Sequence, residues 1–169
     1  WRYRSTDAFF AGLDFNSNLT ISKYLNIDMG ASYTYAQDQL NQNPLILIPP
    51  FSMFQKLKYS PDKASWNLEI IHNYYGKQNR YPNSNFQFNL IENGTLVSKT
   101  VNISESPAGF QKFDAIFSLQ LKEKHKMKKK LRFIVQNLAN AEYRNYLNRM
   151  RFYASEIGRN FQLQFILNY

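Results

Sequence analysis

Cationic and aromatic side chains occur together in two long stretches of the chain, residues 79–109 and 139–158. Guanidinium groups bind anions through charge-assisted hydrogen bonds and also stack on aromatic rings. These stretches are therefore candidates for holding an anionic, aromatic ligand, through Arg80, Tyr81, Arg149, Arg151 and Tyr153, with Phe152 beside them. The same composition is also typical of exposed loops that bind no ligand.

Thioether and imidazole groups, which suit copper, are present but scattered. They are His72, His125, Met53, Met127 and Met150, and the chain has no cysteine. The spacing predicts no shared metal site, and the sequence indicates no cofactor. No paired carboxylates, nucleophile elbow or phosphate-binding loop occurs either, so we expect no enzymatic activity.

The formal net charge of +9 would suit a nucleic-acid-binding protein. However, six lysines lie within residues 122–130, and the rest of the chain is only mildly basic. This clustering weakens the nucleic-acid interpretation, and we expect the lysine run to lie in a solvated turn.

Apolar and polar residues alternate along almost the whole chain, which predicts strands rather than helices. The most regular case is the end of the chain, where Phe161, Leu163, Phe165, Leu167 and Tyr169 share one face. The predicted strands are 8–20, 24–37, 51–59, 65–78, 110–122, 130–138 and 161–169. Most reach the ~9–11 residues that a tilted strand needs to cross a bilayer.

The connections between these strands alternate between short and long. Short connections at 22–23, 61–64 and 123–129 alternate with long ones at 38–50, 79–109 and 139–158. Transmembrane barrels have short periplasmic turns and long extracellular loops, so this pattern favours a barrel over a soluble β-sandwich. If Tyr169 ends in the periplasm, every long loop is extracellular.

The composition agrees with a barrel. The aromatic share is 17%, as expected for aromatic girdles at the two membrane interfaces. The mean hydropathy of −0.52 fits strands that have one apolar and one polar face. Alternation alone is equally compatible with an antiparallel sheet that has one solvated face. A soluble, basic β-domain that binds nucleic acid therefore stays an alternative.

The last third of the chain resembles TonB-dependent outer-membrane receptors. The likeness rests on Asn137-Leu138-Ala139-Asn140-Ala141-Glu142-Tyr143, and on Gly158-Arg159-Asn160-Phe161 with the strand that follows. Ile48-Pro49-Pro50 and Lys77-Gln78-Asn79-Arg80 extend it toward the amino terminus. Ala139 stands where the family usually has Phe, which we interpret as a change in packing.

This resemblance implies that residues 1–169 are the carboxyl-terminal part of an all-β, antiparallel transmembrane barrel of about 22 strands, in the bacterial outer membrane with a periplasmic carboxyl terminus. The plug domain is absent from these residues. The implied function is uptake of a scarce nutrient, such as a ferric siderophore or another metal complex, with energy reaching the plug through the TonB system. The implied partners are the rest of the barrel, the plug, outer-membrane lipid and lipopolysaccharide, and no nucleic acid.

The terminal strand, Phe161 to Tyr169, is also a candidate assembly signal for the outer-membrane insertion machinery, which in this family reads a terminal aromatic strand. A strand that simply faces lipid would have the same pattern. A further alternative is a barrel without transport activity, acting as an adhesin or an assembly scaffold.

Overall fold

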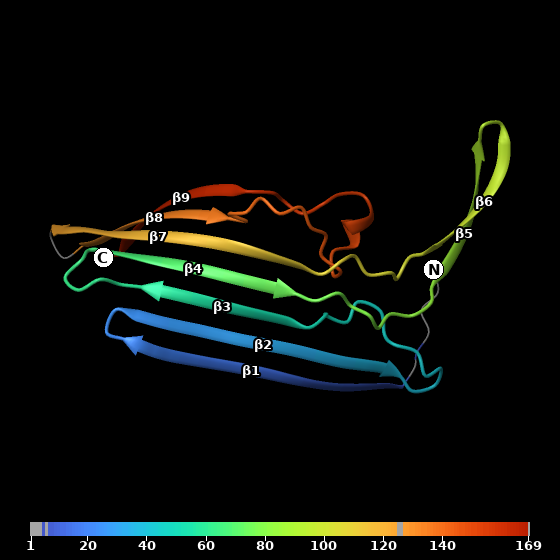
Figure 1. Cartoon of the computed structure of the whole chain (residues 1–169), viewed down its shortest axis with the longest axis horizontal. Coiled ribbons are helices and arrows are strands. Elements are labelled where there is room, and N and C mark those ends of the chain that lie inside the picture. Colours follow the sequence, from blue (N-terminus) through green and yellow to red (C-terminus); the bar gives the residue numbers. More distant parts are fainter. Residues whose placement is uncertain (1–4, 6, 125–126, 169) are drawn as a thin grey trace.

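The chain forms an open, antiparallel sheet of seven strands (Figure 1). The computed structural model describes residues 5, 7–124 and 127–168. The strands of this sheet, in spatial order, are β1 (Ala8–Ser22), β2 (Leu25–Asp38), β3 (Ser52–Tyr59), β4 (Trp66–Tyr75), β7 (Phe110–Lys124), β8 (Met127–Gln136) and β9 (Asn160–Asn168). The predicted all-β, seven-stranded antiparallel architecture is confirmed.

Strand pairing brings the apolar residues of all seven strands onto one face of the sheet. One row crosses the sheet from β1 to β9 through directly opposed residues: Leu19, Ile27, Leu57, Ile70, Ala115, Val135 and Phe161. Large apolar side chains on this face remain exposed; Leu163 is 70% and Phe165 57% accessible. We call this the apolar face. A contiguous apolar surface of this extent fits contact with lipid rather than with water.

The opposite face of the sheet is predominantly polar and carries ion pairs both between strands and within one strand. Lys56 on β3 pairs with Asp28 on β2, with its Nζ 2.6 Å from the carboxylate. Lys112 and Asp114 on β7 form a second pair at 3.1 Å. We call this the polar face. An aromatic ring enters it at Phe54, opposite Gly30; a Cβ on Gly30 would lie 2.5 Å from that ring.

Short and long connections lie at opposite ends of the sheet, as the sequence predicts. The turn end has the connections 23–24, 60–65 and 125–126, whereas the loop end has 39–51, 76–109 and 137–159. Strand β9 runs toward the turn end, where Asn168 pairs with Lys128 near the start of β8. All the long connections therefore lie at the same end of the sheet.

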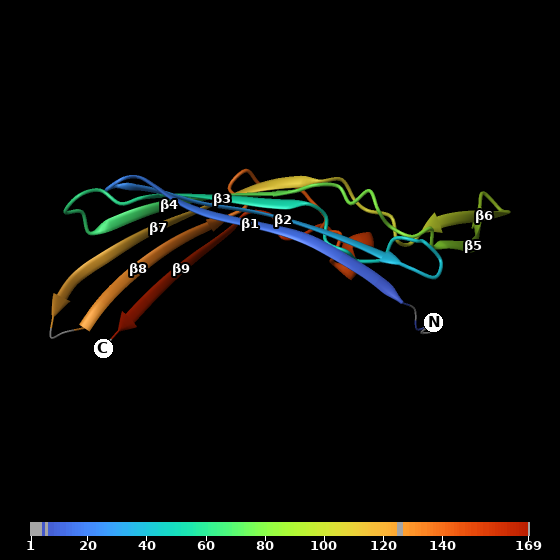
Figure 2. The ribbon, with the colours of Figure 1, turned by 90° about the horizontal axis from the view of Figure 1, so that it is seen from below.

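The sheet is arched rather than flat, and it does not close on itself (Figure 2). Within the described residues, β1 and β9 each have one neighbour and one unpaired edge. Unpaired backbone groups at such edges are prone to pair with further strands. The arch and the two free edges fit a segment of a barrel wall.

A two-stranded hairpin projects from the loop end, within the long connection expected over 79–109 (Figure 1). Its strands are β5 (Asn85–Glu92) and β6 (Thr95–Asn102). They are joined by Asn93 and Gly94, whose φ values of 49° and 80° suit the tight turns that connect twisted hairpins. From the sequence, no strand was expected within the 79–109 loop, so this hairpin was not predicted.

More than half of the buried residues lie in or directly beside the long loops rather than in the strands of the sheet. They include Tyr146, which is 3% exposed, together with Gln78, Ser104, Ser106, Asn137 and Arg151. A search of the described residues finds no helix with the length and apolar character needed to cross a membrane.

Candidate functional site

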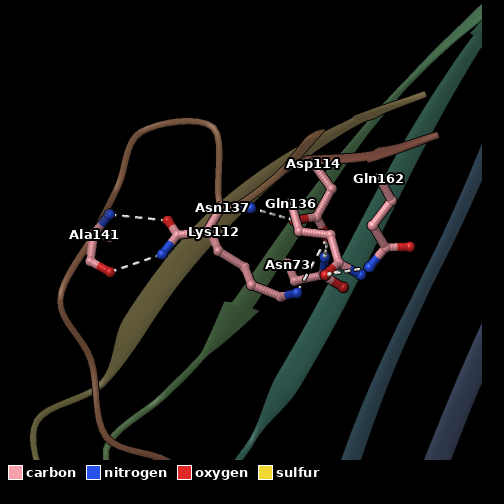
Figure 3. Close-up of polar contacts among 7 residues, drawn as sticks. All are labelled: Asn73, Lys112, Asp114, Gln136, Asn137, Ala141 and Gln162. Carbon is pink, nitrogen blue, oxygen red and sulfur yellow. Dashed lines mark hydrogen bonds and ion pairs between the residues drawn. The ribbon is translucent and has the colours of Figure 1, made fainter. Parts of the chain in front are cut away.

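Asn137, directly after β8, is a structural pivot at the loop end of the sheet (Figure 3). Its side chain donates to the carbonyl of Ala141 at 2.8 Å and accepts from the Ala141 amide at 2.9 Å. Its backbone has φ 51°, a left-handed conformation that asparagine tolerates better than most residues. Asn137 thus closes a five-residue loop and redirects the chain away from the sheet.

Asp114 on β7 fixes this pivot to the polar face of the wall. The residue is 9% exposed, and its carboxylate accepts a hydrogen bond from the Asn137 amide at 2.8 Å. Lys112 and Asn73 donate to its other oxygen at 3.1 and 3.4 Å, so strands β4 and β7 and the start of the last loop meet at one carboxylate. Figure 3 shows this network with the neighbouring Gln136–Gln162 contact.

The two segments that carry the family resemblance, 137–143 and 158–161, contact each other. The side chain of Asn140 accepts from the amide of Arg159 at 2.9 Å, and its oxygen lies where a Cβ on Gly158 would come within 2.9 Å. Glycine at position 158 therefore permits this close approach. Leu138 continues the ladder through its amide, which donates to the carbonyl of Phe113 at 2.7 Å. The two sequence segments of the resemblance are thus one local structure.

The three long loops pack on one another through buried polar groups. The Tyr146 hydroxyl accepts from the amide of Leu47 at 3.3 Å, which joins the last loop to the first. The Gln78 side chain donates to the carbonyls of Ile48 and Pro49 at 2.9 and 3.2 Å, which joins the second loop to the first. These contacts make the loop end a connected layer rather than independent loops.

Among the residues expected to contact a ligand, Arg80 lies against the sheet. Its guanidinium stacks on the ring of Tyr35 at 3.6 Å and donates to Gln37 at 3.2 Å. The adjacent Tyr81 is partly buried. Arg80 is therefore held at the end of β2.

The other expected contacts divide into buried and exposed groups. Arg151 is 4% exposed, and its guanidinium lies over the rings of Tyr146 and Phe152 and donates to the carbonyl of Ile103 at 3.3 Å. Burial lowers the pKa of this guanidinium. Arg149 and Tyr153 are exposed. Arg151 thus joins two loops, whereas Arg149 and Tyr153 remain accessible to a ligand.

Of the sulfur and imidazole groups, Met53 on β3 and His72 on β4 lie on the apolar face, with Met53 opposite Tyr74 and His72 opposite Gln55. His72 stacks on Phe113 at 4.6 Å on the apolar face, where it also contacts Gln111 at 3.2 Å. Met150 is exposed in the last loop. His125 and the side chain of Met127 lie outside the described part. No group of three or more acidic, histidine or cysteine residues that could hold a metal ion is found among the described residues.

The candidate assembly signal lies on the edge strand β9. Phe161, Leu163, Phe165 and Leu167 are exposed on the apolar face, and Phe161 stacks on Phe133 of β8 at 6.2 Å. Tyr169 lies outside the described residues, as do positions 125 and 126 of the lysine run. The expectation that this run forms a turn is wrong for most of it, because β7 continues to Lys124 and β8 begins at Met127.

Comparisons with known proteins agree with this geometry at the level of fold. No family model matches the chain, and no curated protein matches it in sequence. The solved copper transporter OprC has a TM-score of 0.71 and 19% identity, over 92% of this chain and 23% of OprC. FpvA of P. aeruginosa, solved with iron and a heterologous pyoverdine, has a TM-score of 0.58 and 12% identity, over 92% of this chain and 19% of FpvA.

The fold is that of a membrane-type β-barrel wall, with one apolar face, one polar face and sorted loops. More narrowly, it is the fold of a segment of a TonB-dependent receptor barrel, the group to which both solved proteins belong. The chain spans about a fifth to a quarter of the length of these two proteins, 19% and 23%.

Proposed function

We propose that this chain forms part of the wall of an outer-membrane receptor that takes up a scarce nutrient, a metal complex such as a ferric siderophore, by a TonB-dependent route and without enzymatic chemistry. The observation that carries the proposal is the two-sided sheet with its long loops gathered at one end. In this arrangement the apolar face contacts lipid and the polar face lines the lumen. The loop end is extracellular and meets the nutrient first.

The proposal assigns partners to each surface. The free edges of β1 and β9 pair with further strands of the barrel, and the polar face with its ion pairs contacts a plug domain, through which the TonB system supplies energy. Lipopolysaccharide phosphates contact the exposed basic loop residues, and β9 binds the insertion machinery during assembly. The carboxyl terminus is periplasmic because it lies at the turn end.

Membrane orientation predicts which positions a reagent outside the cell can reach. A cysteine at Asn93, at the tip of the projecting hairpin, should react with an impermeant thiol reagent on intact cells. A cysteine at Asp62, in a short turn, should react only after the outer membrane is broken. Both positions are exposed, so reactivity reports the side of the membrane rather than burial. Labelling of Asp62→Cys alone on intact cells would show the opposite orientation.

Transport activity predicts energy-dependent accumulation of a metal complex. Cells that produce the protein should accumulate at least one of a panel of radiolabelled iron and copper complexes faster than cells that lack it. A protonophore should abolish the difference, because the TonB system draws on the inner-membrane proton gradient. Surface labelling at Asn93→Cys without any protein-dependent accumulation would contradict a transport role and favour a barrel that acts as an adhesin or scaffold.

A further inference from the structure

Three aromatic rings form a continuous stack on the polar side of the wall, at the loop end. Tyr75, the last residue of β4, stacks on Phe110, the first residue of β7, with centroids 4.7 Å apart and planes at 23°. Phe110 stacks in turn on Tyr143 of the last loop, at 4.2 Å and 25°. We call these three residues the aromatic column.

The position of the column follows from strand register. Tyr75 and Phe110 are directly opposed across the β4–β7 pair. Both share the face of Asn73 and Asp114, because residues two apart in a strand lie on the same side. The third ring is brought in by the Asn137 pivot, which turns the chain so that Tyr143 covers Phe110. The column therefore stands at the mouth of the proposed lumen rather than in the lipid.

Two hollows border the column. One, of about 190 Å³, is lined by Tyr75 with Asp14, Asn16, Ser32 and Asn73. The other, of about 290 Å³, is lined by Phe110 and Tyr143 with Glu142, Arg144 and Ser155. The second hollow is close to the lower limit of ordinary ligand pockets, roughly 300 Å³. The column thus connects two spaces along the wall.

The groups around the second hollow differ in whether they already have partners. Glu142 accepts a hydrogen bond from the Ser155 hydroxyl at 2.8 Å. Arg144 is exposed and takes part in none of the ion pairs found among the described residues. Burial raises the pKa of the Tyr143 hydroxyl above its ordinary value, so the ring carries no charge at neutral pH. An unpaired cation therefore lies beside a neutral aromatic surface.

We propose that the end of the aromatic column at Tyr143, with Arg144, binds a planar aromatic group that carries a negative charge on the incoming nutrient. The ligand ring adds to the stack, and its anionic substituent pairs with the guanidinium of Arg144. The inference deepens the proposed receptor function by naming a site and a ligand class. Arg80 and Arg151 were expected from the sequence to contact a ligand, but both are held by contacts within the protein.

Binding of two iron complexes to outer-membrane vesicles tests the proposal. The ferric complex of 2,3-dihydroxybenzoate is anionic and aromatic, whereas ferric citrate is anionic without a ring. Wild-type vesicles should bind the aromatic complex more tightly than ferric citrate. Tyr143→Ala should weaken binding of the aromatic complex about 3- to 10-fold, the contribution of one aromatic pair. Tyr143→Phe should retain it, and Arg144→Gln should weaken it in a salt-sensitive way.

Controls separate binding from folding and from receptor function. Phe86→Ala removes an exposed aromatic ring from the projecting hairpin, outside the column, and should leave binding unchanged. Heat-modifiable mobility on gels should be the same for all variants. Wild-type vesicles that bind neither complex, or the two equally, would overturn the ligand class. Unchanged binding in Tyr143→Ala and Phe110→Ala would overturn the site. After either of these two results, the proposed receptor function would still be supported if cells accumulated another metal complex in a protonophore-sensitive way.

Discussion

An arginine at Leu163 should nearly abolish accumulation of the assembled protein in the outer membrane, whereas an arginine at Gln162 should be tolerated. Leu163 lies on the apolar face of β9 opposite Phe133, and it is 70% exposed. Gln162 is its neighbour on the polar face. A cationic residue on the lipid face costs about 2–4 kcal/mol near the bilayer midplane and much less near the interfaces. That cost corresponds to a factor of roughly 30 to 1,000 in an equilibrium constant.

A second pair of arginine substitutions, on β7, distinguishes the effect of lipid contact from the effect of recognition of the terminal strand. Phe117→Arg changes the apolar face far from the carboxyl terminus, and Gln120→Arg changes an exposed position on the polar face. Folded protein in outer-membrane fractions, measured by heat-modifiable mobility, should fall for Leu163→Arg and Phe117→Arg alone. A loss confined to β9 would assign the effect to the assembly signal, and equal tolerance on both faces would contradict the membrane assignment.

The seven strands of the sheet could be predicted because the pleat imposes a period of two on any strand with unlike faces. The least regular of them, 51–59, was harder to recognise because Phe54 falls on its polar side. The structure explains this exception: Phe54 lies opposite Gly30, which has no side chain to compete for the space. Alternation thus predicts on which face a residue lies, except where a small residue on the neighbouring strand, such as Gly30, leaves space for a large ring.

The projecting hairpin was missed although its signal is in the sequence. Asn93-Gly94 is among the strongest two-residue hairpin turns, and Phe86, Phe88 and Leu90 alternate with polar residues before it. Its strands have only eight residues each and lie outside the main sheet, so they do not follow the spacing of the barrel strands. In this segment, the residues of the turn predict the hairpin better than the spacing of the barrel strands does.

Contacts between loops could not be predicted from the sequence. Arg151 has the same chemistry as Arg149, and both were expected to meet a ligand. Only the fold places the carbonyl of Ile103, 48 residues away, against the Arg151 guanidinium. The Tyr143 stack likewise depends on a turn at Asn137 and on the register between β4 and β7. Long-range packing decides which of several similar side chains remains free.

Loss of the Asn137 side chain should release the last loop from the barrel wall. In the native structure this side chain makes both hydrogen bonds to Ala141, while its backbone amide donates to the buried Asp114. Each neutral hydrogen bond contributes about 0.5–1.5 kcal/mol. A left-handed conformation costs a residue such as alanine a further ~1–2 kcal/mol. The sum predicts that Asn137→Ala destabilises the closed loop by about 2–5 kcal/mol.

Hydrogen exchange of peptides covering 137–159 in the detergent-solubilised barrel measures this change. For Asn137→Ala, the local opening constant should rise by a factor of roughly 30 to 5,000. Asn137→Gly loses the same side-chain bonds but accepts φ 51° without strain, so its loop should open less than that of the alanine variant. Leu138→Ala, which keeps the backbone bond to Phe113, is the matched control and should exchange like the wild type. Equal exchange in all four proteins would mean that Asn137 does not hold the loop. Opening in the glycine variant as large as in the alanine variant would assign the whole effect to the two bonds with Ala141.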